Sequence, residues 1–228
     1  MIKNISNLGD AGVYIDFGKD VNESTNTEVI SYFNHFLNLG KEKKIDGIKN
    51  LIPSYNKLVL SFDINVTNFK TIKKAIENLK IKKNKTTISK KIKIPICCDN
   101  VYALDFNRLT KKLNLSKEEI LNLFLKKEYF CYMTGFIAGM PFLGDVDKLI
   151  RVKRHETPRV TVPKGSVAMT EQFSNIYTQE SPGGWNIIGN TPMKFFDKSN
   201  SKNPTLVKPG DKIKFYKISK EEYLNWNE

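Results

Sequence analysis

The stretch TPRVTVPKGSVAMTEQFSNIYTQESPGGWNIIGNTP, residues 157–192, decides the fold prediction. Clusters of glycine and proline interrupt it at 163–165, 181–184 and 189–192, and the runs between them are short and β-rich. Such spacing is typical of turns that join the strands of an all-β sheet or barrel. The pattern continues to Ile218, with a further turn at 209–211. We therefore expect the C-terminal half of the chain to be built of strands.

One of these turns also suggests a binding site. Gly183 and Gly184 are both free to take positive φ, and they precede the large aromatic side chain of Trp185. Backbone N–H groups in such a turn can converge on an anion beside a stacking wall. Arg159 and Lys164 lie close in sequence and would add positive charge. A small ligand that carries a carboxylate would suit this site.

Several motifs together resemble one family. ESPGGWNIIGNTP (180–192), TPRVTVPKGSVA (157–168) and GFIAGMPFLG (135–144) look like blocks of the 5-oxoprolinase B-subunit family, also known as allophanate hydrolase subunit 1 or the sporulation-kinase-inhibitor family. The resemblance runs from GDAGVYIDFG at 9–18 to KPGDKIKF at 208–215, nearly the whole chain. It implies a cyclophilin-like β-barrel in the C-terminal half.

The resemblance also implies an activity and partners. In that family this component pairs with an allophanate hydrolase subunit 2-like protein (the C component), and a LamB/YcsF-type protein (the A component) joins them. The complex opens 5-oxo-L-proline to L-glutamate with ATP, whose site is not located; phosphorylation of the lactam oxygen would make the carbonyl attackable by water. Carried over by position, the substrate-binding residues are Gly135, Phe136, Gly139, Arg159, Pro163, Gly165, Ser166, Tyr177, Ser181, Pro182, Gly183, Gly184, Trp185 and Thr191.

The same segments depart from the family pattern. The usual GFxPGFxYL carries Ala138, Met140 and Phe142 here, and the usual GGQTGIYP carries Phe173 and Asn175 at its glutamine and third glycine positions. A histidine usually found before the first of these loops aligns with Phe124, and the arginine of IGRTP is Asn190. The changes remove a potential acid or base and a bidentate anion fork. They make a divergent paralogue with another carboxylate ligand, or a regulator that inhibits a sensor histidine kinase, alternatives to the enzyme component.

The N-terminal region shows a different pattern. An alternating strand at 13–17, a helix over 22–39, a hairpin over 45–63, a helix capped by Thr67 or Asn68, and a strand through Ile92, Ile94 and Ile96 follow one another. The order βαββαβ predicts a ferredoxin-like domain. The predicted fold class is thus α+β, with a ferredoxin-like domain at 1–88 and a cyclophilin-like barrel at 89–228; the boundary falls within 81–98.

Composition narrows the functional class. The 228 residues carry a net charge of +13, but the excess is mostly lysine spread along the chain, so we expect no nucleic-acid partner. No apolar run reaches the roughly 18 residues of a membrane span, and the N-terminus does not read as a signal peptide, so we expect a cytoplasmic protein without a membrane. Cys97, Cys98 and Cys131 lack metal-site spacing, which predicts buried thiols and no metal.

No catalytic residue can be assigned from the sequence. His155 lies in a basic stretch, which favours a solvated side chain over a proton carrier. Ser166 follows a Pro-Lys-Gly turn and is expected to be a turn residue rather than a nucleophile. Neither a phosphate-binding GxxxxGK[ST] loop nor a Gly-x-Ser-x-Gly elbow is present. ATP is therefore expected to bind through another architecture or on another protein of the complex.

Overall fold

The computed structural model of the chain describes residues 2–41, 46–79 and 89–227. The chain divides into two compact units, 1–88 and 89–228, and each has its own hydrophobic core. Both α-helices and β-strands are present, so the mixed α+β class is confirmed. No helix within the described ranges is long and apolar enough to cross a membrane.

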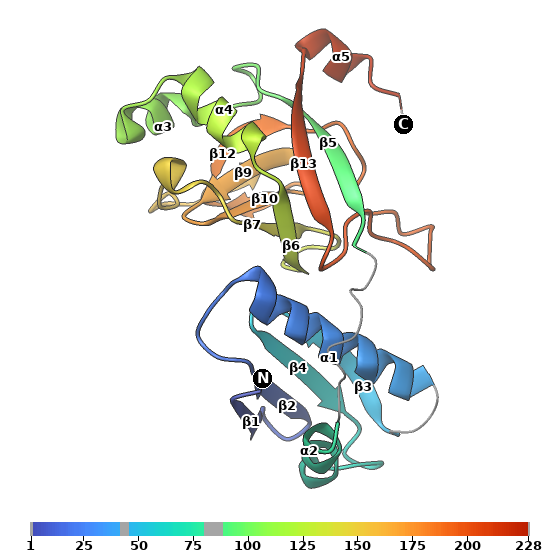
Figure 1. Cartoon of the computed structure of the whole chain (residues 1–228). Coiled ribbons are helices and arrows are strands. Elements are labelled where there is room, and N and C mark those ends of the chain that lie inside the picture. Colours follow the sequence, from blue (N-terminus) through green and yellow to red (C-terminus); the bar gives the residue numbers. More distant parts are fainter. Residues whose placement is uncertain (1, 42–45, 80–88, 228) are drawn as a thin grey trace. The chain divides into compact units, whose positions relative to one another are not determined.

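The first unit is a four-stranded antiparallel sheet in the order β1-β2-β4-β3 (Figure 1). Its elements are β1 (Asn4–Asn7), β2 (Gly12–Asp16), α1 (Glu23–Lys41), β3 (Ile48–Pro53), β4 (Lys57–Phe62) and α2 (Phe69–Glu77). Alternation of apolar residues along β2 and β4 buries Val13, Ile15, Leu58 and Leu60 completely, against the apolar sides of the helices. Asn68 caps α2 by accepting a hydrogen bond from the Thr71 N–H.

A ferredoxin-like N-terminal domain is not confirmed. The unit has the order ββαββα, because β1 precedes β2 at the edge of the sheet. The strand predicted to close it, through Ile92, Ile94 and Ile96, is β5 (Lys91–Cys97), which pairs with strands of the second unit instead. Alternating isoleucines predict a strand with one buried face, but they do not identify the sheet that the strand joins.

The second unit is a closed seven-stranded barrel in the order β10-β7-β6-β13-β5-β12-β9. Its strands are β5, β6 (Tyr129–Thr134), β7 (Pro141–Gly144), β9 (Ser166–Thr170), β10 (Phe173–Ile176), β12 (Asn186–Asn190) and β13 (Lys212–Ile218). A short ribbon of β8 (Arg159–Val162) and β11 (Ser181–Gly183) lies outside the barrel order. The helices are α3 (Phe106–Leu113), α4 (Lys117–Lys126), the 3₁₀ turn η1 (Lys148–Ile150) and α5 (Lys220–Leu224).

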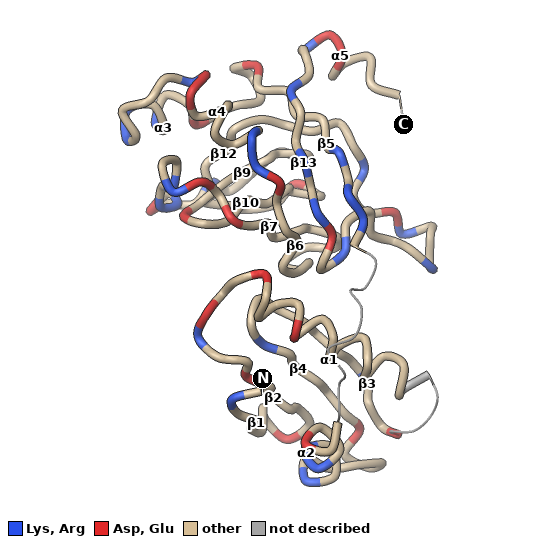
Figure 2. Tube along the Cα trace, viewed as in Figure 1, with Lys and Arg blue, Asp and Glu red and all other residues tan. Residues whose placement is uncertain are grey.

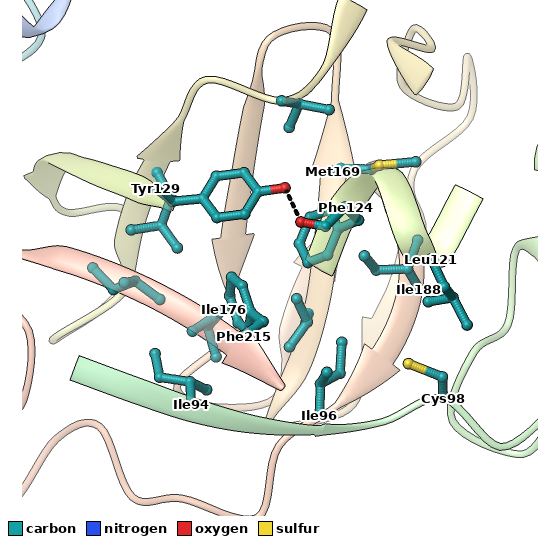
Figure 3. Packing of buried hydrophobic residues seen from close by; sticks show 14 of the residues in the cluster. Ile94, Ile96, Cys98, Leu121, Phe124, Tyr129, Met169, Ile176, Ile188 and Phe215 are labelled. Carbon is teal, nitrogen blue, oxygen red and sulfur yellow. Dashed lines mark hydrogen bonds between the residues drawn. The ribbon is translucent and has the colours of Figure 1, made fainter. Parts of the chain in front are cut away.

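The barrel encloses a core of aliphatic and aromatic side chains (Figure 3). A capping box formed by Ser116 and Glu119 starts α4, which inserts Phe124 into this core. The Phe124 ring lies 5.0 Å from that of Tyr129 and 5.2 Å from that of Phe215, and the Tyr129 hydroxyl donates to the Phe124 carbonyl. Closure of the sheet leaves these strands no free edge.

Lysines are concentrated on two neighbouring barrel strands, β5 and β13 (Figure 2). β5 and β13 run parallel with Lys91 opposite Lys212 and Lys93 opposite Lys214. Glu128 lies 3.3 Å from the Lys91 ammonium and 3.9 Å from that of Lys212. The sequence shows these lysines as two separate alternating runs, and only strand pairing brings them together.

Candidate functional site

A cavity of about 310 Å³ lies on the outside of the barrel in the second unit. It shares Tyr177 with a small apolar cluster that also includes Ala168 and Ile187 and is separate from the barrel core. Ala168 alternates with Val167 and Met169, which point into the barrel, so the cluster faces outward. The cavity is lined by Phe136, Met140, Phe142, Arg154, Pro158, Asn175, Tyr177, Pro182, Gly183, Gly184 and Trp185.

Aromatic side chains form the walls. The rings of Phe142 and Trp185 meet edge to face, with centroids 5.6 Å apart. Phe136 is 70% exposed at the cavity and has a φ of 69°, a region that disfavours residues with a side chain. Backbone strain of this kind clusters at binding sites, where the surrounding structure maintains it.

The two glycines before Trp185 do not have the backbone conformation that was expected from the sequence. Neither Gly183 nor Gly184 has a φ in the left-handed region, and Gly183 is the last residue of strand β11, so the expected turn with positive φ does not form. Gly183 is required for close approach instead, because a Cβ there would lie 2.2 Å from the Tyr177 hydroxyl oxygen. At Gly184 the nearest atom would be 3.5 Å away, an ordinary contact.

Polar groups are few in this cavity. Asn175 is 1% exposed, and none of the described residues provides a hydrogen bond to its Oδ1. Arg154 is exposed and places a cationic side chain at the cavity. Burial raises the pKa of Tyr177, while hydrogen bonding to the Asn175 side chain and the Trp185 backbone and the charge of Arg159 act in the opposite direction. The tyrosine is therefore a neutral hydrogen-bonding group at physiological pH.

A charged cluster adjoins the cavity. Asp105, 3% exposed, precedes α3 but does not cap it; its Oδ1 lies 3.0 Å from His155 Nε2 and 2.6 Å from Arg159 Nη2. Its Oδ2 accepts the Ile187 N–H at 2.7 Å. The His155 N–H donates to the Gly184 carbonyl at 2.7 Å, which ties the cluster to the cavity wall. His155 is therefore bonded and only 22% exposed, and the predicted solvated position is wrong.

Arg159 holds one further unpaired group. Its Nη1 atom is buried and has no hydrogen-bond partner among the described residues. Arg159 lies on β8, and its charge acts on Tyr177 at the cavity. The sequence prediction included Arg159 but not Asp105. An aspartate before a helix is usually a helix cap, and no local pattern shows that its side chain contacts His155, 50 residues further along the chain.

The structure brings part of the predicted set together. Phe136, Tyr177, Pro182, Gly183, Gly184 and Trp185 line the cavity. The residues of the predicted set that do not line it are Gly135, Gly139, Arg159, Pro163, Gly165, Ser166, Ser181 and Thr191. Ser166 is 1% exposed, and its carbonyl accepts the Tyr177 N–H at 2.9 Å, as befits a residue with a structural role. Sequence reasoning missed Arg154 and Pro158 as cavity residues, and it noted Met140, Phe142 and Asn175 only as departures from the family.

The departures at Asn190 and Phe124 have structural roles. Asn190 Nδ2 donates to the Lys164 carbonyl at 2.8 Å, and its Oδ1 accepts the Tyr223 hydroxyl at 2.9 Å, which joins the 163–165 turn to α5. Gly165 has a φ of +82°, and a Cβ there would lie 2.3 Å from Asn190 Oδ1. Phe124 is wholly buried in the barrel core and does not line the cavity. These two changes therefore do not remove polar groups from the cavity.

A metal ion or ATP would need ligands that the described residues do not bring together. None of the ranges 2–41, 46–79 and 89–227 contains a group of three His, Cys, Asp or Glu side chains placed to hold a metal ion. The cavity beside Trp185 has one cationic side chain and mainly apolar walls, whereas a triphosphate needs several convergent donors. The cavity does not fit ATP. A second cavity, of about 370 Å³ in the first unit, contains none of the predicted site residues.

The barrel and its outer cavity belong to a carboxyltransferase-type domain. The family model described as "Carboxyltransferase domain, subdomain C and D" matches residues 3–207. Over 236 residues the chain is 30% identical to the 5-oxoprolinase B subunit of Bacillus subtilis (strain 168), covering 98% of this chain and 96% of the relative. The chain therefore belongs to the carboxyltransferase-domain family that includes the 5-oxoprolinase B subunits.

Solved structures agree with this placement. The crystal structure of TTHA0988 superposes with a TM-score of 0.80 at 28% identity, over 92% of this chain and 40% of that chain. The Kluyveromyces lactis urea carboxylase superposes with a TM-score of 0.77 at 17% identity, over 98% of this chain and 24% of that chain. The second likeness shows the fold alone. Relative to these two proteins, the chain spans less than half of their length.

Proposed function

We propose that this chain is the B subunit of an ATP-dependent 5-oxoprolinase-type complex, which opens 5-oxo-L-proline to L-glutamate together with partner subunits. The observation that carries the proposal is the end-to-end similarity to the Bacillus subtilis 5-oxoprolinase B subunit. Because that alignment includes nearly all of this chain and of the relative, the similarity is not confined to one shared motif.

The cavity supports a small ligand of this kind. Its volume of about 310 Å³ lies at the lower end of the ~300–1,000 Å³ typical of small-molecule pockets and suits a single five-membered ring. Phe142 and Trp185 offer flat apolar surfaces to such a ring and exclude water from it. Arg154 would bind the ligand carboxylate, since a guanidinium can donate two parallel hydrogen bonds to it.

In this proposal the partner proteins provide the ATP site and the chemistry at the lactam carbonyl. We assign ATP to a partner protein, because the cavity does not fit a triphosphate. The partners are a protein like allophanate hydrolase subunit 2 and a LamB/YcsF-type protein. This chain would then bind and orient the lactam, hold it away from bulk water, and leave its carbonyl accessible to the partner's chemistry.

Reconstitution tests the proposal. The chain is mixed with its two partner proteins, 5-oxo-L-proline and ATP, and L-glutamate is measured. We expect ATP-dependent release that requires this chain, and at least tenfold slower release with Trp185→Ala because a stacking wall is lost. Tyr216→Ala, at an exposed aromatic residue on β13, is the matched control and should leave the rate unchanged. No glutamate from the complete mixture would refute the proposal.

A second experiment tests the alternative that the chain inhibits a histidine kinase. The chain is tagged in its native lysate and the co-purifying proteins are identified. A subunit 2-like protein is expected, and recovery of a histidine kinase in its place would contradict the proposal of an enzyme component. Two of the departures that motivated a regulator, at Phe124 and Asn190, have packing and hydrogen-bonding roles and do not favour it.

A further inference from the structure

The Asn175 side chain is the one polar group of the cavity wall that is both deeply buried and incompletely bonded in the described structure. The residue is 1% exposed, and its Oδ1 accepts no hydrogen bond from any described residue. The Asn175 side chain also acts on Tyr177, where it opposes the effect of burial and lowers the pKa of the hydroxyl. Folding rarely leaves a buried amide oxygen unsatisfied, so each such group requires a reason. A ligand in the cavity would supply the missing donor.

The position of Asn175 on β10 directs the side chain into the cavity. Asn175 is in register with Ala168 on β9 and with Phe142 on β7, and all three belong to the outward-facing side of the barrel. Ala168 is small and leaves room beside the asparagine. The family motif carries glycine where this chain carries Asn175, so the acceptor belongs to this chain and not to the general pattern of the family.

The surroundings define which donor fits. Aromatic and aliphatic walls favour a compact, mainly apolar ligand. Arg154 is the cationic side chain of the lining, and no ion pair with it is found in the described residues, so a positively charged donor such as an ammonium is disfavoured and a carboxylate is favoured. A ligand with a neutral N–H next to an anionic group would pair with both residues, the N–H with Asn175 and the anionic group with Arg154. Secondary amides and lactams that carry a carboxylate have this arrangement.

We propose that Asn175 is a specificity-determining residue whose Oδ1 accepts the N–H of a small anionic secondary amide or lactam, with Arg154 on its carboxylate. The inference rests on the proposed function in that it uses the same cavity and ligand class. It goes further by naming the residue that selects an amide over the corresponding ester.

Three probe ligands test whether the ring N–H is the group that Asn175 recognises. They are 5-oxo-L-proline, its N-methyl derivative, and the γ-lactone in which a ring oxygen replaces the N–H. Binding is measured by calorimetry with the full chain, alone and in the reconstituted complex. We expect the lactam to bind about tenfold or more tightly than the lactone, because the lactone leaves the buried Oδ1 unpaired. The N-methyl derivative should also bind weakly.

Variants assign the effect to Asn175. Asn175→Ala should weaken lactam binding about tenfold and bring the lactam-to-lactone ratio close to one. Asn107→Ala, at an exposed asparagine on α3, is the matched control and should keep the ratio of the unchanged chain. Thermal unfolding of both variants checks that they fold.

Each outcome has one meaning. An unchanged ratio in folded Asn175→Ala overturns the inference even if the complex releases glutamate. Selective lactam binding without ATP-dependent glutamate release supports the inference and refutes the proposed function. If none of the probes binds in either form of the protein, the inference is overturned.

Discussion

At the scale of single residues, Asp105 connects the most distant parts of the candidate site. One carboxylate accepts from His155, Arg159 and the Ile187 backbone, which lie 50, 54 and 82 residues away in sequence. Because Asp105 is almost fully buried, its negative charge is stabilised by these donors instead of by water. Arg159 in turn acts on Tyr177, so Asp105 is a positioning residue for the cavity.

Asp105→Asn should therefore lower both stability and ligand affinity. The amide keeps the shape but loses the charge and places an N–H₂ group among donors, which we expect to cost about 2–3 kcal/mol in the free energy of unfolding. Chemical denaturation measures the change. Asp197→Asn is the control, because its ion pair with Lys194 is exposed and screened by solvent and should contribute little to stability. Equal effects of the two variants would contradict the role given to Asp105.

The buried thiol of Cys98 predicts a pH dependence of stability. Burial, followed by the neighbouring Cys97, raises its pKa from 9.0 to about 12. The folded state therefore holds this proton more tightly than the unfolded state, and stability should fall as pH rises from about 9 towards 12. Urea denaturation between pH 7 and 11 measures the slope, which Cys98→Ala should reduce. A slope that is the same in both proteins would contradict the prediction.

At the scale of elements, the two glycines of the 181–185 segment differ in how much room the surrounding structure leaves for a side chain. Gly183→Ala would place a methyl group against the Tyr177 hydroxyl, so either β11 or the tyrosine must move and the cavity changes shape. Gly184→Ala meets only ordinary contacts and is the matched control. We expect Gly183→Ala to lower ligand affinity at least tenfold and the melting temperature by several degrees. If both variants keep the same affinity and melting temperature, the prediction is wrong and the Tyr177 side chain must have moved aside.

The paired lysines of β5 and β13 give another prediction for an element. Lys93 lies opposite Lys214, so Lys93→Glu replaces a like-charge pair with an attractive one and should stabilise the protein by about 0.2–1 kcal/mol. Lys217→Glu is the control, because its neighbour across the strands is Ile96. Urea midpoints at low and high salt measure the gain, which should shrink as salt increases. A loss of stability with Lys93→Glu would refute this reading of the barrel surface.

How far the sequence predicts each element depends on how local its cause is. The Ser116 capping box and the Asn68 cap were predictable, since each is set by residues within one helical turn. The partners of β5 were not, because alternation defines a buried face and not a neighbour. The Asp105 cluster and the unpaired oxygen of Asn175 depend on long-range packing, which no local pattern encodes.

At the scale of the whole molecule, the candidate site belongs to one unit. Every residue that lines the cavity, and every member of the Asp105 cluster, lies within 89–228. That unit has its own closed barrel and core, and β5 begins only two residues after its start. The first unit contributes none of the described residues of the cavity, so its role in ligand binding is separable by experiment.

A fragment of residues 89–228 should therefore fold and bind the lactam as the full chain does. A barrel of 140 residues is large enough to bury most of its apolar surface without help. We expect cooperative thermal unfolding and an affinity for 5-oxo-L-proline within about threefold of the full chain, measured by calorimetry. The fragment carrying Asn175→Ala is the control, and it should lose affinity by the same factor as the full-length variant. A soluble, folded fragment that does not bind would mean that residues 1–88 complete the site, because the cavity itself would still be present.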